Sequence, residues 1–387
     1  MDFGIGQGTA HGTAHGTAHG TAHGTTHGTA HGTAHGLHAG GSAGPALGHA
    51  IAITHDAVIG FWDGTPEFGP APLGSDAENP FDYLSPTNRA YLIDGELCSL
   101  FSVHPSADGG TIKQKGKHLL TLKRPEPGYF KTQLRFLRDY ADLRSERINE
   151  ISIQTGDLIS FFGAVGYLNS TRRKYTTELL YTVLRMTARL EHQMKHLCRA
   201  PRPIDLSPSV NPVIQTPDHS AFPSGHATEA FVLATVLHAL MGGLTDETVE
   251  TPRDLGRETV DGLSRRNPAT EPIQTNQGYP MPYRVAARIA INRTIAGVHF
   301  PIDSTAGAVM GCLIGQSLQD IAQGKLFGRN AAVKMPDKTE DFDLHHVNDL
   351  LIARTISGAA ATTQDAPAGF AWLWRKAQAE WTKGVGQ

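Results

Sequence analysis

Residues 219–240 read HSAFPSGHATEAFVLATVLHAL and join a turn to a strongly apolar helix. The apolar run 230–240 is well short of the about 20 residues that a membrane span needs, and it carries His238. It therefore predicts a buried core helix and no integral membrane span. Ser224 and Gly225 stand directly before this helix, where unpaired N–H groups and the helix dipole favour an anion. Taken alone, the fragment also fits an N-cap serine with a turn glycine.

Apolar residues recur at helical spacing on both sides of this stretch. The segments that we expect to be helical are 128–153, 156–168, 172–198, 226–241, 282–296, 301–323, 342–356 and 367–382. The second half of the chain shows no convincing period-two alternation of the kind that marks a half-buried strand. The sequence therefore predicts an all-α protein built as a helical bundle. Gly307, Gly311 and Gly315 fall four apart and predict that a neighbouring helix approaches closely.

The N-terminal region is a tetrapeptide array, Gly-Thr-Ala-His, repeated seven times over residues 8–36 with one change at Thr26. A glycine at every fourth position costs a helix about 1 kcal/mol each relative to alanine, so a flexible tail is favoured over stacked imidazoles. We expect three regions: a disordered tail at 1–50, a helical-bundle catalytic domain at 51–335, and C-terminal helices at 336–387 that pack on the bundle. A polar segment, 242–281, is predicted to be an insertion.

Composition excludes several classes of function. The 387-residue chain has Lys+Arg 34 and Asp+Glu 37, a net charge of −3, which gives no bulk attraction for nucleic acid or an anionic membrane. Its three cysteines, Cys98, Cys198 and Cys312, are too few and too far apart for a disulfide framework and predict free thiols. No signal peptide is visible at the N-terminus. We expect a soluble protein, with a cytoplasmic location favoured and the oligomeric state open.

Several charged residues stand where a bundle would bury them. Arg293 continues the apolar stripe of helix 282–296, and an arginine that faces a core needs an anion beside it, either a ligand or a salt-bridge partner. His299 and Asp303 are four apart, so the carboxylate could accept the Nδ1–H and leave Nε2 open; a surface helix pair is the alternative. Lys195 and Arg202 flank the end of helix 172–198, and Lys195 taken alone is expected to be exposed to solvent.

Together, these fragments carry more information than each does alone. They are Lys195-x6-Arg202-Pro203, Pro223-Ser224-Gly225-His226 and Arg293-x5-His299-x3-Asp303. The residue types and spacings resemble the signature shared by type 2 phosphatidic acid phosphatases and vanadium-dependent haloperoxidases. One departure is Asn292, where that family usually has serine. The motifs cover 195–303, and the helical pattern extends the resemblance to roughly 85–325.

The resemblance implies a helical bundle of the acid phosphatase/vanadium haloperoxidase type with one oxyanion site. It implies that His299 is the apical group, either a phosphorylated nucleophile or the ligand of vanadium. It implies that His226 acts as the general acid–base and that Asp303 completes the catalytic set with the two histidines. The residues implied to hold the vanadate or phosphate are Lys195, Arg202, Ser224, Gly225 and Arg293.

Two chemistries are possible at such a site. His219 and the Gly-His-Ala-Thr ending of the second motif look like those of bromoperoxidases, whereas Pro301 looks like that of phosphatases. We expect a haloperoxidase-like enzyme that oxidises halide with hydrogen peroxide and takes vanadate as cofactor. The alternative is a cofactor-free phosphatase that hydrolyses a phosphomonoester through phosphohistidine. Either would act on a small-molecule substrate. A third hypothesis, a non-catalytic metal-storage protein built on the histidine repeats, predicts that deletion of residues 1–40 abolishes function.

Overall fold

A computed structural model describes residues 45–59, 61–65, 80–242, 279–333, 340–353, 357–362 and 367–382. The chain divides into two compact units. The first runs to Ser85 and includes Thr155–Asp157, and its described part holds helix α3 (Pro45–Val58) and a 3₁₀ helix, Pro80–Tyr83. The second, Pro86–Gln154 with Leu158–Gln387, contains all three motifs. The histidine repeats and most of the predicted insertion lie outside the described residues, and the predicted domain boundaries stay predictions.

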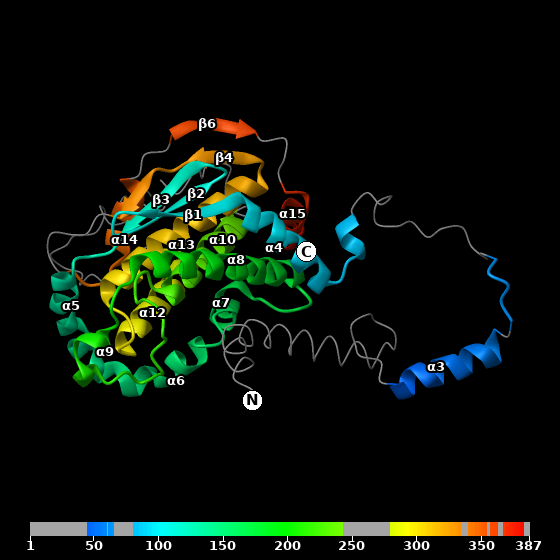
Figure 1. Ribbon diagram of the computed structural model, residues 1–387, viewed down its shortest axis with the longest axis horizontal. Coiled ribbons are helices and arrows are strands. Elements are labelled where there is room, and N and C mark those ends of the chain that lie inside the picture. Colours follow the sequence, from blue (N-terminus) through cyan, green and yellow to red (C-terminus); the bar gives the residue numbers. More distant parts are fainter. Residues whose placement is uncertain are drawn as a thin grey trace. The chain divides into compact units, whose positions relative to one another are not determined.

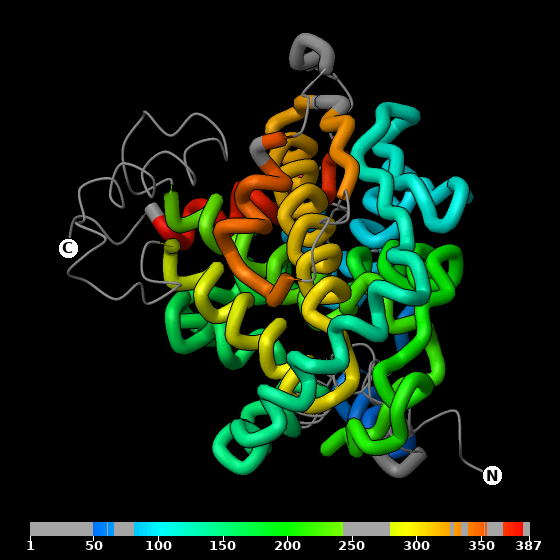
Figure 2. Tube along the Cα trace, turned by 90° about the vertical axis from the view of Figure 1, so that its left-hand side faces the viewer, coloured from blue at the N-terminus to red at the C-terminus, as the bar shows by residue number. Residues whose placement is uncertain are grey.

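Four helices form the centre of the second unit: α8 (Lys174–Cys198), α10 (Gly225–Gly242), α12 (Met281–Ile295) and α13 (Pro301–Ala322). Helix α10 packs against the other three. Every residue of α10 from Ala227 to Leu237 is buried, because this helix has no polar face to turn toward water. Figure 2 shows α13, in yellow and orange, running through the middle of the unit. These four helices confirm the expected bundle.

Helices α10 and α13 touch through their backbones. A Cβ added at Gly307 would lie 2.5 Å from the carbonyl oxygen of Ser224, and one at Gly311 would lie 2.4 Å from that of Thr228. Neither position can hold a side chain, so the close approach predicted from the glycine spacing is confirmed. The contacts advance in the same direction along both helices, so the two run parallel. Their N-terminal ends, which carry the second and third motifs, therefore lie side by side.

The other described helices of this unit lie around these four (Figure 1): α4 (Pro86–Leu100), α5 (Pro127–Tyr140), α6 (Arg144–Gln154), α7 (Ile159–Gly166), α9 (Pro203–Leu206), α14 (Leu344–Ile352) and α15 (Ala368–Thr382). The helix expected over 128–153 is divided by a 3₁₀ turn, Ala141–Leu143. Helices α4 and α15 pack on α8. The Glu380 carboxylate accepts two backbone N–H bonds at the start of α8, each of 2.8 Å. Among the helices of the described ranges, none is both long and apolar enough to cross a membrane.

The all-α prediction is wrong in one respect, because the unit also contains two small sheets. Strands β1 (Phe101–Ser106), β2 (Gly109–Gln114) and β3 (Lys117–Lys123) form an antiparallel meander, and β5 (Ala331–Val333) pairs parallel to β3. Strands β4 (Lys325–Gly328) and β6 (Ser357–Thr362) form the second sheet. Strands β1 and β2 pack on α8, and β3 and β4 pack on α13. Their sequences lack a clear alternation, because the buried face of β2 carries a glycine and Gln114 beside its one isoleucine.

Candidate active site

Lys195 lies in the last turn of α8 and points into the unit. Its ammonium group donates to the carbonyl oxygens of Pro223, at 2.6 Å, and Ser220, at 3.2 Å. Only 1% of the residue is exposed, so the expectation of a solvent-exposed lysine is wrong. Two carbonyl oxygens supply the partners that water would otherwise provide. Burial lowers the pKa of Lys195 to about 8, and the carboxylate of Glu191 opposes this effect.

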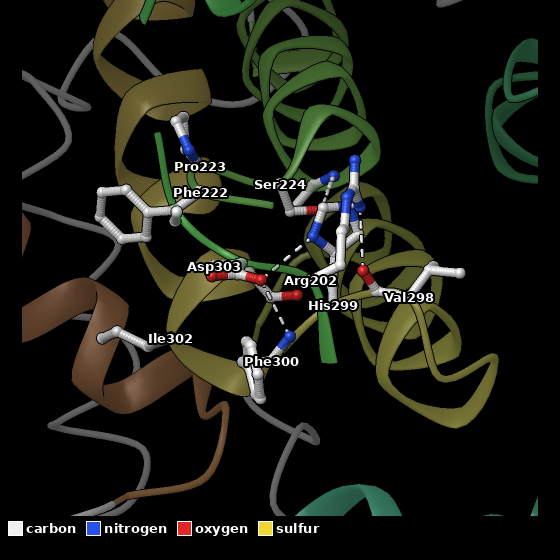
Figure 3. Close-up of polar contacts among 12 residues, drawn as sticks. Arg202, Phe222, Pro223, Ser224, Val298, His299, Phe300, Ile302 and Asp303 are labelled. Carbon is white, nitrogen blue, oxygen red and sulfur yellow. Dashed lines mark hydrogen bonds and ion pairs between the residues drawn. The ribbon is translucent and has the colours of Figure 1, made fainter. Parts of the chain in front are cut away.

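Arg202 connects the first motif to the third. It is the residue before α9, and its backbone N–H donates to Asp205 at 2.7 Å. Its Nη1 donates to the carbonyl oxygen of Val298 at 2.9 Å and lies 3.1 Å from Nε2 of His299 (Figure 3). Burial lowers the pKa of Arg202 to about 10, and Asp303 acts in the opposite direction. The guanidinium stays charged at neutral pH and touches the imidazole directly.

His299 stands between a carboxylate and a cation. Its Nδ1 lies 3.2 Å from Oδ2 of Asp303, which also accepts the Phe300 backbone N–H at 2.9 Å (Figure 3). Since Arg202 can only donate, the neutral ring carries its proton on Nδ1 and its lone pair on Nε2. Burial, and then the positive charges of Arg202 and Lys195, hold the pKa of His299 well below its usual value. The ring is therefore neutral, and Nε2 is a potential nucleophile.

Asp303 is fully buried in the first turn of α13, with Pro301 at the first helical position. Burial raises the pKa of Asp303 to about 7, although the Phe300 N–H and the nearby cations act in the opposite direction. The ionised form is the one that accepts the Nδ1–H of His299. The contact expected from the four-residue spacing is therefore present in the structure.

Ser224 and Gly225 form the turn into α10. The Ser224 backbone N–H donates to the backbone carbonyl of Asp303 at 2.9 Å, and the Ser224 hydroxyl accepts the Ala227 N–H at 3.4 Å. A Cβ at Gly225 would lie 2.6 Å from Oε1 of Glu191, so this position has room only for glycine. Ser224 is thus an N-cap serine of α10, as the fragment taken alone predicts. An anion-binding role for Ser224 or Gly225 stays a prediction.

Arg293 is the least satisfied charged group of the site. It lies on α12 with 1% of its surface exposed, and its Nη2 donates to Oε1 of Gln154 at 2.8 Å. Its Nε and Nη1 are buried and have no hydrogen-bond partner among the residues that the structure describes. Within the described ranges, no carboxylate forms an ion pair with it, and burial alone lowers the pKa of Arg293 to about 10. A buried cation with two unpartnered donor nitrogens indicates a place for an anion.

His226 occupies the first turn of α10, and its Nε2 lies 3.0 Å from the backbone carbonyl oxygen of Gln154. A carbonyl can only accept, so Nε2 carries a proton and Nδ1 is the nitrogen that can gain or lose one. A positive charge on His226 also lowers the pKa of His299, so the two imidazoles are close enough to interact electrostatically.

The contacts join the predicted residues into two groups. Lys195, Ser224 and Asp303 belong with Arg202 and His299, whereas Arg293 and His226 meet at Gln154. The sequence did not single out Gln154, a helix-terminal residue far from every motif. Asn292, the departure from the family pattern, donates to Oε1 of Gln154 and to Oε2 of Glu150, both at 3.1 Å. An amide with two donors serves both contacts, whereas a serine hydroxyl has one.

The family model described as PAP2 superfamily matches residues 175–323. This segment begins in α8, ends after α13 and contains all of the predicted site residues. The match agrees, over this segment, with the family resemblance that the three motifs indicated.

Named relatives share part of this region. The decaprenylphosphoryl-5-phosphoribose phosphatases of two Mycobacterium tuberculosis strains, CDC 1551 / Oshkosh and H37Rv, are each 26% identical over 132 residues, 34% of this chain and 53% of theirs. The chain thus spans about half the length of the curated relatives it matches. The crystal structure of a transmembrane PAP2 type phosphatidylglycerolphosphate phosphatase from Bacillus subtilis aligns with a TM-score of 0.26 and 17% identity, over 61% of this chain and 85% of that one.

Proposed function

We propose that the protein is a phosphatase that hydrolyses a phosphomonoester through a phosphohistidine at His299. The observation that carries the proposal is Arg293, which is buried with two unpartnered donor nitrogens and, among the described residues, no counter-ion. Lys195 and Arg202 add two more buried cations. A phosphate dianion would supply the missing acceptors and the missing negative charge. The two curated relatives are named as phosphatases, which favours this chemistry over halide oxidation.

The first half of the reaction would transfer the phosphoryl group to the enzyme. Arg202 would exchange its hydrogen bond to Nε2 of His299 for one to a phosphate oxygen. The lone pair of Nε2 is then available to attack phosphorus. A P–N bond forms as the P–O bond to the leaving alcohol breaks. Asp303 stabilises the imidazolium that results, and His226 gives its proton from Nδ1 to the leaving oxygen.

The second half would release inorganic phosphate. His226, now neutral, takes a proton from a water molecule as the water oxygen attacks phosphorus. The P–N bond breaks, its electron pair returns to Nε2, and His299 and His226 regain their starting states. The three cations balance the negative charge on the phosphoryl oxygens throughout both halves.

The haloperoxidase interpretation uses the same residues and stays a prediction. The cations that would hold phosphate would also hold vanadate, with Nε2 of His299 as its ligand. Bound vanadate would supply a Lewis acid that activates peroxide. The names of the relatives do not support this second chemistry.

The test compares His299→Ala with the wild-type protein, using p-nitrophenyl phosphate and a quenched assay for acid-labile phosphoenzyme. Loss of a covalent catalyst should reduce turnover by a factor of about 10³ or more and remove the phosphoenzyme. His104→Ala, an exposed histidine on β1, is the matched control and should keep full activity. Activity of His299→Ala within about threefold of wild type would contradict the proposal. Bromide oxidation that requires vanadate, without phosphatase activity, would favour the haloperoxidase.

A further inference from the structure

Gln154 is the last residue of α6 and lies outside the segment that the family model matches. Only 1% of it is exposed. Its backbone carbonyl oxygen accepts from Nε2 of His226, and its side-chain Oε1 accepts from Nη2 of Arg293. One residue thus contacts the proposed proton donor with its backbone and the proposed anion-binding arginine with its side chain.

The orientation of the Gln154 amide follows from its neighbours. Oε1 receives two donors, Arg293 at 2.8 Å and Asn292 at 3.1 Å, so the oxygen must face α12. The other end, Nε2, is buried and has no hydrogen-bond partner among the described residues. The Gln154 amide nitrogen is therefore unpartnered beside an arginine that has two unpartnered donor nitrogens of its own.

Helix α6 is firmly attached to the segment that leads into His299. Ile151, one turn before Gln154, is fully buried in a cluster with Ile295, Ala296 and Val298. Arg144, at the start of α6, donates to the carbonyl oxygens of Ile295 at 3.0 Å and of Val210 at 2.8 Å. These contacts fix the main chain of Gln154 relative to residues 295–298, so Gln154 does not lie on an independent loop.

We propose that Gln154 is a positioning residue of the oxyanion site, which holds Arg293 and His226 in a fixed relation. The proposal rests on the function proposed above and extends it to a residue outside the three motifs. A glutamine suits this role because a neutral amide oxygen orients the guanidinium without neutralising it. A glutamate of nearly the same shape would pair with Arg293 and remove the positive charge that the anion needs.

The experiment measures the affinity of the full chain for orthovanadate, together with KM and kcat for p-nitrophenyl phosphate, in Gln154→Glu and Gln154→Met. Gln316 provides the matched control. It is also a buried glutamine, its Oε1 accepts from the buried Arg329 at 3.1 Å, and its Nε2 has no hydrogen-bond partner in the described part of the chain. It lies on α13 about 20 Å along the helix from Asp303, so Gln316→Glu and Gln316→Met change the same chemistry away from the site.

Gln154→Glu should weaken orthovanadate binding and raise KM by about tenfold or more, since it neutralises one of the cations that bind the anion. It should also raise the melting temperature of the unliganded protein, because Arg293 gains a counter-ion. Gln154→Met keeps the carbonyl for His226 but releases Arg293, and should weaken binding by about three- to tenfold. The Gln316 variants should keep the wild-type affinity. A residue with a purely structural role would lower the melting temperature and leave the affinity unchanged.

Two results would overturn the inference. Orthovanadate affinity of Gln154→Glu within threefold of wild type would show that Gln154 does not position the site. The same loss of affinity in the Gln316 variants would show a general effect of changing a buried glutamine. Both results require that the wild-type protein binds orthovanadate, so they differ from failure of the proposed function, in which the wild-type protein neither binds orthovanadate nor hydrolyses the ester.

Discussion

Replacing Arg293 with methionine should make the unliganded protein more stable while destroying its affinity for anions. Burial lowers the pKa of Arg293 from the ordinary arginine value to about 10. At about 1.36 kcal/mol per pKa unit, holding this charge in the folded protein costs about 3 kcal/mol. Methionine removes that cost but also removes the hydrogen bonds to Gln154 and Ile151, worth about 1 kcal/mol each. The net expectation is a gain of about 1 kcal/mol in the free energy of unfolding.

The effect on ligand binding should be much larger and of the opposite sign. Nε and Nη1 of Arg293 would each donate a charge-assisted hydrogen bond worth about 1.5–3 kcal/mol to a bound anion. Loss of both predicts orthovanadate binding that is weaker by a factor of roughly 10² to 10⁴. The folded-state pKa lies below the unfolded one, so the cost of burial is complete below about pH 10 and fades as the pH rises toward the ordinary pKa of arginine. Measurements at pH 7 therefore include the full free-energy cost of burying the Arg293 charge.

Urea unfolding of Arg293→Met and wild type, each with and without saturating orthovanadate, measures both effects. Arg89→Met is the contrasting control, because Arg89 is a buried arginine whose two bonds to Glu178, of 2.7 and 2.8 Å, give it a full counter-ion. Removing that partner should cost about 3–5 kcal/mol. If Arg293→Met loses comparable stability and orthovanadate still stabilises it, Arg293 is a structural arginine and the reasoning is refuted.

Two further predictions separate the roles of the other site residues. His226→Ala should reduce turnover by about 10²–10⁴ while orthovanadate still binds, whereas Arg202→Ala should weaken that binding outright, and calorimetry beside turnover distinguishes them. Equal losses of affinity would place His226 among the anion ligands. Because the pKa of Lys195 is lowered to about 8, it loses its charge above that pH, and kcat/KM should fall there. Lys195→Arg should shift this decline by more than about one pH unit, and an unmoved decline would assign it to another group.

The sequence predicts the central helices well, because a buried helix shows a pattern of apolar residues within a short stretch of the chain. Helix α10 is apolar on every side, and the stripe of α12 runs directly into Arg293, so each pattern is visible within about four turns of chain. The glycine spacing of α13 is equally local. The motif spacings predict most of the proposed site because each motif spans eleven residues or fewer, where local backbone geometry limits the arrangements.

The strands and the supporting residues could not be predicted from the sequence, because their positions depend on contacts between distant parts of the chain. The turn between β2 and β3 uses Lys115 and Gly116, both with positive φ, and only its glycine is a familiar signal. Strand β5 pairs with β3 across some 200 residues, and no local pattern records such a partner. Gln154 likewise owes its place to contacts with α10 and α12. The burial of Lys195 follows from the Pro223 carbonyl oxygen, whose position only the folded chain determines.

The backbone contact between α10 and α13 has a consequence for how the chain can vary. The relative placement of the second and third motifs depends on Gly307 and Gly311 lying against α10, and not on the peptide that connects α10 to α12. Loop closure depends only weakly on loop length, so that connection can lengthen or shorten at little thermodynamic cost. The backbone contact at Gly307 and Gly311 therefore sets the distance between the two motifs without any intervening side chain. Sequence changes in the connecting segment should therefore leave the proposed site residues aligned, whereas a single methyl group added at Gly307 or Gly311 would disturb that alignment.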